Sequence, residues 1–169
     1  MARRAWVVVV WSICAVGVAA EPRPVVRAYF TDGAIRGAVV RAVLGARLRL
    51  SRTGCRRVLT DFTDPGGRSL VASLDATGLE ASEYVTERIW FVDGSDEPAC
   101  VKPGETAAFT AVGSRVVHVC AARFARFRPH SAAAEVVLIH EILHTLGLGE
   151  NPPSSAEITR QVTARCGRG

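Results

Sequence analysis

The chain has 169 residues, of which 49% are hydrophobic and 22% are charged, and its formal net charge is +5. This length suits one domain with a hydrophobic core, and the sequence contains no long repeats or low-complexity tracts. The net charge falls to +3 without Arg3 and Arg4, and basic residues do not alternate with aromatic ones. Nucleic acid is therefore not expected as a partner.

Residues 1–20 have the features of a secretory signal peptide. Arg3 and Arg4 form the positive start, an apolar core follows from Ala5 to Gly17, and Val18-Ala19-Ala20 provides small residues for cleavage. The apolar run is too short to span a bilayer, although an uncleaved membrane-anchoring segment is the alternative interpretation. We expect residues 21–169 to form a single exported domain, periplasmic or extracellular, which is monomeric and has no stable membrane association.

Four of the five cysteines follow this leader, namely Cys55, Cys100, Cys120 and Cys166. An even number in an exported chain indicates two disulfides, with three possible pairings. We predict that Cys100 pairs with Cys120, because the two flank an expected hairpin, and that Cys55 pairs with Cys166. Zinc binding by the cysteines is less consistent with the sequence, since no C-x-x-C pair occurs.

Helices are expected in the first part of the chain. Apolar residues at helical spacing predict a leading segment and then a helix from Asp32 to Leu48, whose arginines face solvent. Residues 55–62 are expected to form a short helix before Asp64-Pro65-Gly66-Gly67 forces a turn. A further short apolar element follows and ends at Gly78.

Strands are expected between residues 86 and 120. The segment T-E-R-I-W-F-V, from Thr86 to Val92, is the clearest candidate because of its β-branched and aromatic residues. Residues 98–104 are expected to form a loop. Residues 107–110 and 115–120 can then pair as a hairpin across the turn at Val112-Gly113-Ser114.

The stretch A-E-V-V-L-I-H-E-I-L-H-T-L-G-L-G-E, residues 134–150, contains the pattern H-E-x-x-H. On a helix, His140 and His144 lie one turn apart on one face, so both imidazoles can bind one metal ion. Glu141 borders that face. Ser131 is expected to cap the helix and Gly147 to end it. Beyond the motif, a capping box at residues 154–157 predicts a last helix that runs through Cys166.

With Gly147 and Glu150, the string becomes H-E-x-x-H-x-x-G-x-x-E, which resembles the active site of zincin metallopeptidases, most closely of the metzincin type. The resemblance covers residues 140–150 and implies that Glu150 is the third metal ligand. It also implies that an edge strand above the helix, at residues 107–110 or 115–120, pairs with extended substrate. Two features depart from that family: His or Asp is usual where Glu150 stands, and no methionine turn is possible because Met1 is the only methionine.

Three other residues compete with Glu150 for the third ligand position, namely Glu157, His118 and His130. Glu157 already has a structural role as the capping-box partner of Ser154. His118 lies in an apolar strand, where a hydrogen-bonded core histidine is the usual state, and His130 precedes the metal helix.

The expected fold is α+β, a small zincin-like domain in which a short mixed sheet packs against the metal-binding helix and two or three further helices. The expected cofactor is Zn2+, because two imidazoles and one carboxylate are a common catalytic zinc set with one position open for water. Glu141 would then be the catalytic base, taking a proton as water attacks the carbonyl of a peptide or protein substrate.

The sequence therefore favours a secreted zinc metallopeptidase, and within that class an endopeptidase. A secreted metal-binding module without turnover is the alternative, and hydrolysis of a non-peptide amide or ester is a third possibility. Catalysis would also require an oxyanion donor. The only tyrosines are Tyr29 and Tyr84, and the sequence places neither of them relative to the metal.

Overall fold

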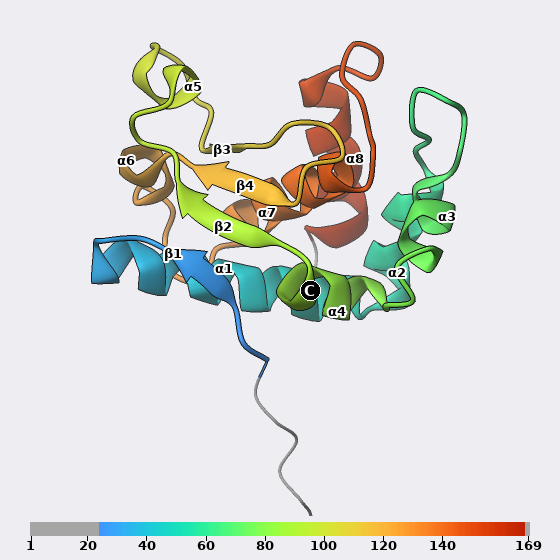
Figure 1. The fold of residues 1–169 in the computed structure, drawn as a ribbon, viewed down its shortest axis with the longest axis horizontal. Coiled ribbons are helices and arrows are strands. Elements are labelled where there is room, and N and C mark those ends of the chain that lie inside the picture. The colour runs from blue at the N-terminus through green and yellow to red at the C-terminus, as the bar shows by residue number, and fades with distance from the viewer. Residues whose placement is uncertain (1–23, 168–169) are drawn as a thin grey trace, which may run out of the picture.

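The computed structural model of the protein describes residues 24–167, so the predicted signal peptide at residues 1–20 lies outside the described residues. The described chain is an α+β fold with a short mixed sheet, which confirms the predicted fold class (Figure 1). The strands are β1 (Arg27–Tyr29), β2 (Trp90–Asp93), β3 (Ala108–Phe109) and β4 (Val116–Val119). In the order β1-β2-β4-β3 the first three strands run parallel, and β3 pairs antiparallel with β4 at the edge of the sheet.

Two long helices, α1 (Gly33–Leu50) and α7 (Ala132–Thr145), pack against each other and share one hydrophobic core with the sheet. The Asp32 carboxylate caps α1 by accepting hydrogen bonds from the first backbone amides of that helix. The predicted start of this helix is therefore confirmed, and the helix continues past the predicted end at Leu48.

Shorter elements connect these layers. They are the helices α2 (Thr53–Arg56), α3 (Leu70–Asp75), α4 (Ala81–Glu87), α5 (Pro98–Val101), α6 (Ala121–Phe124) and α8 (Ser155–Cys166), and the 3-10 turn η1 (Arg57–Thr60). The predicted helix at residues 55–62 thus corresponds to the end of α2 followed by η1. Residues 98–104, which we expected to be a loop throughout, begin with α5, because Pro98 occupies its first turn.

The strand predicted from Thr86 to Val92 is wrong for its first half, since β2 begins only at Trp90. Glu80 and Glu83 form a capping box that starts α4, and the Thr86 hydroxyl donates to the Glu83 carbonyl within that helix. Of the predicted strand, only Thr86 and Glu87 belong to this helix, and the apolar residues from Trp90 to Val92 do lie in β2. A cap and tertiary burial here outweigh β propensity.

The C-terminal helix α8 begins at the predicted place, because the Ser154 hydroxyl accepts a hydrogen bond from the Glu157 amide. The Glu157 carboxylate does not complete the expected capping box. It accepts hydrogen bonds from the side chains of Arg160 and Gln161 instead. One capping contact is therefore sufficient to start this helix.

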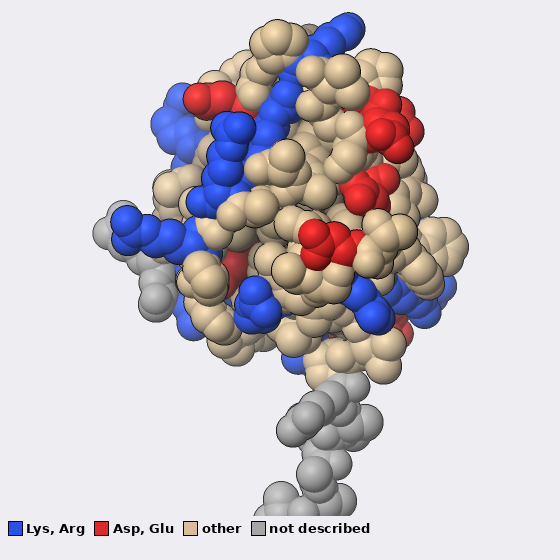
Figure 2. Space-filling model, turned by 90° about the vertical axis from the view of Figure 1, so that its left-hand side faces the viewer, with Lys and Arg blue, Asp and Glu red and all other residues tan. Residues whose placement is uncertain are grey.

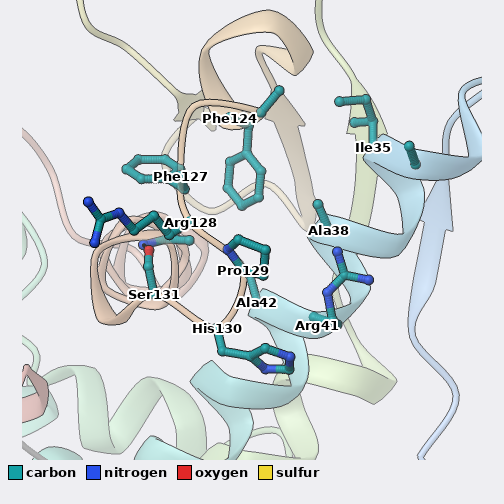
Figure 3. Close-up of a pocket in the computed structure, with 13 residues that line it drawn as sticks. Ile35, Ala38, Arg41, Ala42, Phe124, Phe127, Arg128, Pro129, His130 and Ser131 are labelled. Carbon is teal, nitrogen blue, oxygen red and sulfur yellow. Dashed lines mark hydrogen bonds between the residues drawn. The ribbon is translucent and has the colours of Figure 1, made fainter.

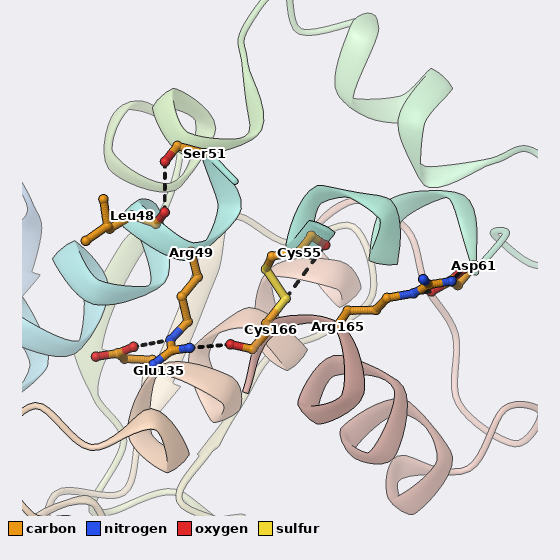
Figure 4. The surroundings of a disulfide bond; sticks show 8 residues. All are labelled: Leu48, Arg49, Ser51, Cys55, Asp61, Glu135, Arg165 and Cys166. Carbon is orange, nitrogen blue, oxygen red and sulfur yellow. Dashed lines mark hydrogen bonds and ion pairs between the residues drawn. A yellow bond between two sulfur atoms is a disulfide. The ribbon is translucent and has the colours of Figure 1, made fainter. Parts of the chain in front are cut away.

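Both predicted cysteine pairs are at disulfide distance: Cys55 is joined to Cys166, and Cys100 to Cys120. The first bond ties α2 to the end of α8 (Figure 4), and the second ties α5 to the end of β4. Within residues 24–167, no helix is long and apolar enough to cross a membrane. On the face shown in Figure 2, several basic side chains lie next to one another in a band from the top to the left of the view, and acidic side chains lie mainly on the right.

Candidate metal centre

Helix α7 forms as the sequence predicts and brings two imidazoles together. The Ser131 hydroxyl caps its start by accepting from the Ala134 amide, and Gly147, with a φ of +108°, follows its end. His140 and His144 lie one turn apart on the same face, and both are buried. Their Nε2 atoms are 3.1 Å apart, close enough for both to contact one ion.

The turn at Gly147 places Glu150 near the two imidazole rings. Glu150 Oε1 lies 3.8 Å from Nε2 of His140 and 3.7 Å from Nε2 of His144, and 42% of its side chain is exposed. A point equidistant from the three atoms lies about 2.1 Å from each, the length of a bond from zinc to an imidazole nitrogen or a carboxylate oxygen. The spacing of the three donor atoms is therefore compatible with one shared metal ion.

The other three candidates for the third ligand lie elsewhere. Glu157 contacts Arg160, as described above. His118 stacks on Phe109 in the sheet, with ring centroids 5.0 Å apart. His130 lines a separate cavity of about 240 Å³, formed mainly by apolar side chains of α1 and of the segment between α6 and α7 (Figure 3). Among the described residues, only Glu150 joins the two helix histidines.

The outward-facing nitrogens of the two rings each have a partner. His144 Nδ1 lies 2.7 Å from the Leu148 carbonyl oxygen, and His140 Nδ1 lies 2.9 Å from Thr159 Oγ1 on α8. Because a carbonyl can only accept, the His144 proton sits on Nδ1 and its Nε2 keeps a free lone pair. A threonine hydroxyl can accept in the same way from His140. Both rings can thus offer Nε2 to a metal while Nδ1–H is satisfied.

Glu141 is buried beside this group. Burial, and then the nearby Glu150 carboxylate, raise the pKa of Glu141 to about 8, and a hydrogen bond from the Thr110 backbone amide opposes this rise. Burial, and then the neighbouring His144, lower the pKa of His140 to about 4. His140 is consequently neutral at pH 7, as a metal ligand must be, and Glu141 has a pKa suited to proton transfer near neutrality.

A cleft runs past the candidate ligands between the β3 segment and α8. It consists of two cavities of about 440 and 670 Å³. His140 and Glu141 line both cavities, together with Thr106 and Ala108 from the β3 segment and Ser155 from α8. Of the three candidate metal ligands, His140 therefore lies where the two cavities meet, and His144 and Glu150 line only the smaller one.

Neither tyrosine lines this cleft. The Tyr84 hydroxyl is buried behind α7 and lies 3.1 Å from the Thr145 hydroxyl, and Tyr29 is exposed on β1 at the opposite edge of the sheet. Sequence reasoning missed Thr159, although the cap at Ser154 located the helix that carries it. The contact depends on how α8 packs against α7, for which the sequence has no local signal.

A scan against protein-family models finds no match, and searches of the curated proteins and of the solved structures also find none. The resemblance to metzincins thus remains confined to residues 140–150.

Proposed function

We propose that this protein is an exported zinc endopeptidase. One observation carries the proposal: three donor atoms with the spacing of a zinc site face a cleft, and the carboxylate of Glu141 lies buried beside them. The two cysteine pairs and the lack of a membrane-spanning helix among residues 24–167 are compatible with export.

Zinc is the metal that this donor set suits best. Two neutral imidazoles and one carboxylate are typical of catalytic zinc sites, in which three protein ligands leave a coordination position free. When bound, the ion would supply a Lewis acid that polarises a carbonyl and makes water more acidic. The partly exposed Glu150 carboxylate lines the cleft, so an ion held by the three residues would be accessible from the cleft.

Glu141 is the residue that we expect to move protons. It takes a proton from the water that attacks the peptide carbonyl, and it then delivers this proton to the departing amine. In the metal-free chain, burial raises the pKa of Glu141 to about 8, so this carboxyl group holds a proton at neutral pH. A nearby cation favours the ionised form, so metal binding prepares Glu141 to act as the base.

The edge strand β3 supports a peptide as the substrate. Its one neighbour in the sheet is β4, and its residues Ala108 and Phe109 line the cleft. An extended peptide can pair with the free backbone groups of such an edge. Because the cleft continues on both sides of His140 and Glu141, a chain can pass through it, which favours cleavage within a polypeptide over removal of terminal residues.

The test uses purified protein of residues 21–169, loaded with zinc and supplied with a library of internally quenched peptides. Glu141→Gln should lower kcat/KM by about 10²- to 10⁴-fold while one zinc ion per chain remains bound. Glu87→Gln, a change of the same type at an exposed position, is the matched control and should cleave like the wild type. Unchanged cleavage by Glu141→Gln would disprove the proposed mechanism.

One observation favours a second candidate function, a metal-binding module without turnover: no tyrosine lines the cleft to serve as an oxyanion donor. This alternative predicts that the wild-type protein binds zinc tightly and cleaves no peptide in the library. Metal-dependent cleavage of any library member that is lost with Glu141→Gln would eliminate it.

A further inference from the structure

We infer that Thr159 is a positioning residue for the metal centre, and that the anchored helix α8 exists in part to present this hydroxyl to His140. The inference rests on the proposed metal site and deepens it. It assigns a role to a residue outside the H-E-x-x-H motif and its glycine turn.

The contact itself is specific. Thr159 Oγ1 lies 2.9 Å from His140 Nδ1, and it is the only hydrogen-bond partner of that nitrogen among the described residues. When the hydroxyl accepts from Nδ1–H, the His140 Nε2 lone pair faces the point shared with His144 and Glu150. The hydroxyl therefore holds the ring in the orientation that can bind a metal, and it can accept the Nδ1 proton that a metal-bound His140 would carry.

The other tautomer of His140, with its proton on Nε2, would interfere with metal binding. Nε2 of His140 and Nε2 of His144 are 3.1 Å apart, within hydrogen-bond distance. A proton on Nε2 of His140 would bond the two rings directly and block the position of the ion. A metal-bound His140 would carry its proton on Nδ1, where the Thr159 hydroxyl can accept it, so removal of the hydroxyl would leave that N–H without this partner and should weaken metal binding even if the rings keep their places.

The position of Thr159 is fixed from the far end of α8. Cys166 is bonded to Cys55, and the Arg165 guanidinium donates two hydrogen bonds to the Asp61 carboxylate, at 2.7 and 2.8 Å (Figure 4). Within the helix, Ile158 and Val162 are buried in the core on either side of this turn. Rotation or sliding of α8 is thereby opposed at several points.

The buried Arg49 also links α8 to α7, the helix that carries His140. Arg49 of α1 donates to the Glu135 carboxylate on α7 and to the Cys166 carbonyl at the end of α8 (Figure 4). The two helices are consequently joined at two places, through Arg49 near one end and through His140 and Thr159 nearer the cleft. Two contacts fix a relative orientation that one contact would leave free.

The experiment compares three variants of the mature protein. Thr159→Val keeps the shape and removes the hydroxyl, Thr159→Ser keeps the hydroxyl, and Thr163→Val makes the same change one turn later at an exposed position outside the cleft. Zinc affinity is measured by competition with a chromogenic chelator. Thr159→Val should bind zinc about 10- to 100-fold more weakly than the wild type, and the other two variants should bind it as the wild type does.

Two further measurements separate positioning from a general structural role. The cobalt-substituted Thr159→Val protein should show an altered visible absorption spectrum, because the geometry around the ion changes. The metal-free protein should melt at the same temperature as metal-free Thr163→Val. If metal-free Thr159→Val melts at a lower temperature than metal-free Thr163→Val, Thr159 has a structural role and the inference is overturned.

The outcomes also distinguish this inference from the proposed function. If the wild type binds no zinc, the proposed function fails and the inference fails with it. If the wild type and Thr159→Val bind zinc equally tightly, or if Thr159→Ser is as weak as Thr159→Val, only the role of the hydroxyl is disproved.

Discussion

Helix α7 carries two buried glutamates, and their surroundings differ. Glu135 and Glu141 are each 7% exposed. Glu135 pairs with the buried guanidinium of Arg49, whereas none of the ion pairs within residues 24–167 includes Glu141, which lines the cleft. Burial alone therefore does not mark a glutamate as a candidate catalytic residue. Glu141 is a candidate because it lacks a cationic partner and lies next to the candidate metal ligands.

The space around Glu135 and Glu141 also differs. Glu135 packs so tightly against α1 that a Cβ atom at Gly45 would overlap its carboxylate. Glu141 instead borders both cavities of the cleft. One carboxylate thus joins two helices, and the other is accessible to a substrate.

The largest expected effect on stability comes from the partnered glutamate. Glu135→Gln leaves the Arg49 charge buried without its counter-charge, so we expect the free energy of unfolding to fall by about 3–5 kcal/mol. Urea denaturation measures this loss. The zinc content and the kcat of the molecules that remain folded should be close to those of the wild type. A stability similar to wild type would mean that the pair is not buried in solution.

A paired substitution sharpens this test. Arg49→Met combined with Glu135→Leu removes both charges, so the double variant should be more stable than either single variant, even though Arg49 also bonds the Cys166 carbonyl. A double variant as unstable as the sum of the two single changes would show that the two residues act independently.

Sequence reasoning located α7 and its candidate metal ligands because the signals for them are local. Ser131, Gly147 and the spacing to Glu150 all lie within or next to α7, and the structure places each as expected. The division between the two glutamates could not be predicted, since Arg49 precedes Glu135 by 86 positions and only tertiary packing brings them together. The same reason hid the contact between His140 and Thr159.

The misassigned strand has a different cause. The predicted strand began at Thr86, a β-branched residue that also suits the buried face of a short helix, whereas its apolar residues from Trp90 onwards do lie in β2. The capping box at Glu80 and Glu83 is a local signal that would have located α4. This error affects a helix behind the sheet and leaves the candidate site unchanged.

The unpartnered glutamate should have its own effect, a dependence of stability on pH in the metal-free protein. The pKa of Glu141 rises from 4.5 to about 8 on folding, so the folded chain holds a proton there that the unfolded chain has lost. The free energy of unfolding therefore falls as the pH increases from 4.5 to about 8, where the folded chain also loses this proton. The pKa of His140 falls from 6.5 to about 4, so this residue makes stability fall only as the pH decreases below 6.5.

Between pH 6.5 and 8, Glu141 should thus cost the metal-free protein about 2 kcal/mol of unfolding free energy. Urea denaturation in the presence of a chelator measures this change at the two pH values. Glu141→Gln should remove it, and Glu135→Gln should leave it in place. A pH dependence that persists in Glu141→Gln would assign it to another group.

The smallest expected effect comes from a third buried contact of α7. The Tyr84 hydroxyl lies 3.1 Å from Thr145 Oγ1, on the side of the helix away from the cleft. Tyr84→Phe removes this hydrogen bond and should lower the free energy of unfolding by about 1 kcal/mol. Because the hydroxyl does not line the cleft, kcat and zinc affinity should not change. A drop in kcat at unchanged zinc affinity would give Tyr84 a part in catalysis, and would show that a contact behind α7 influences the reaction proposed for Glu141.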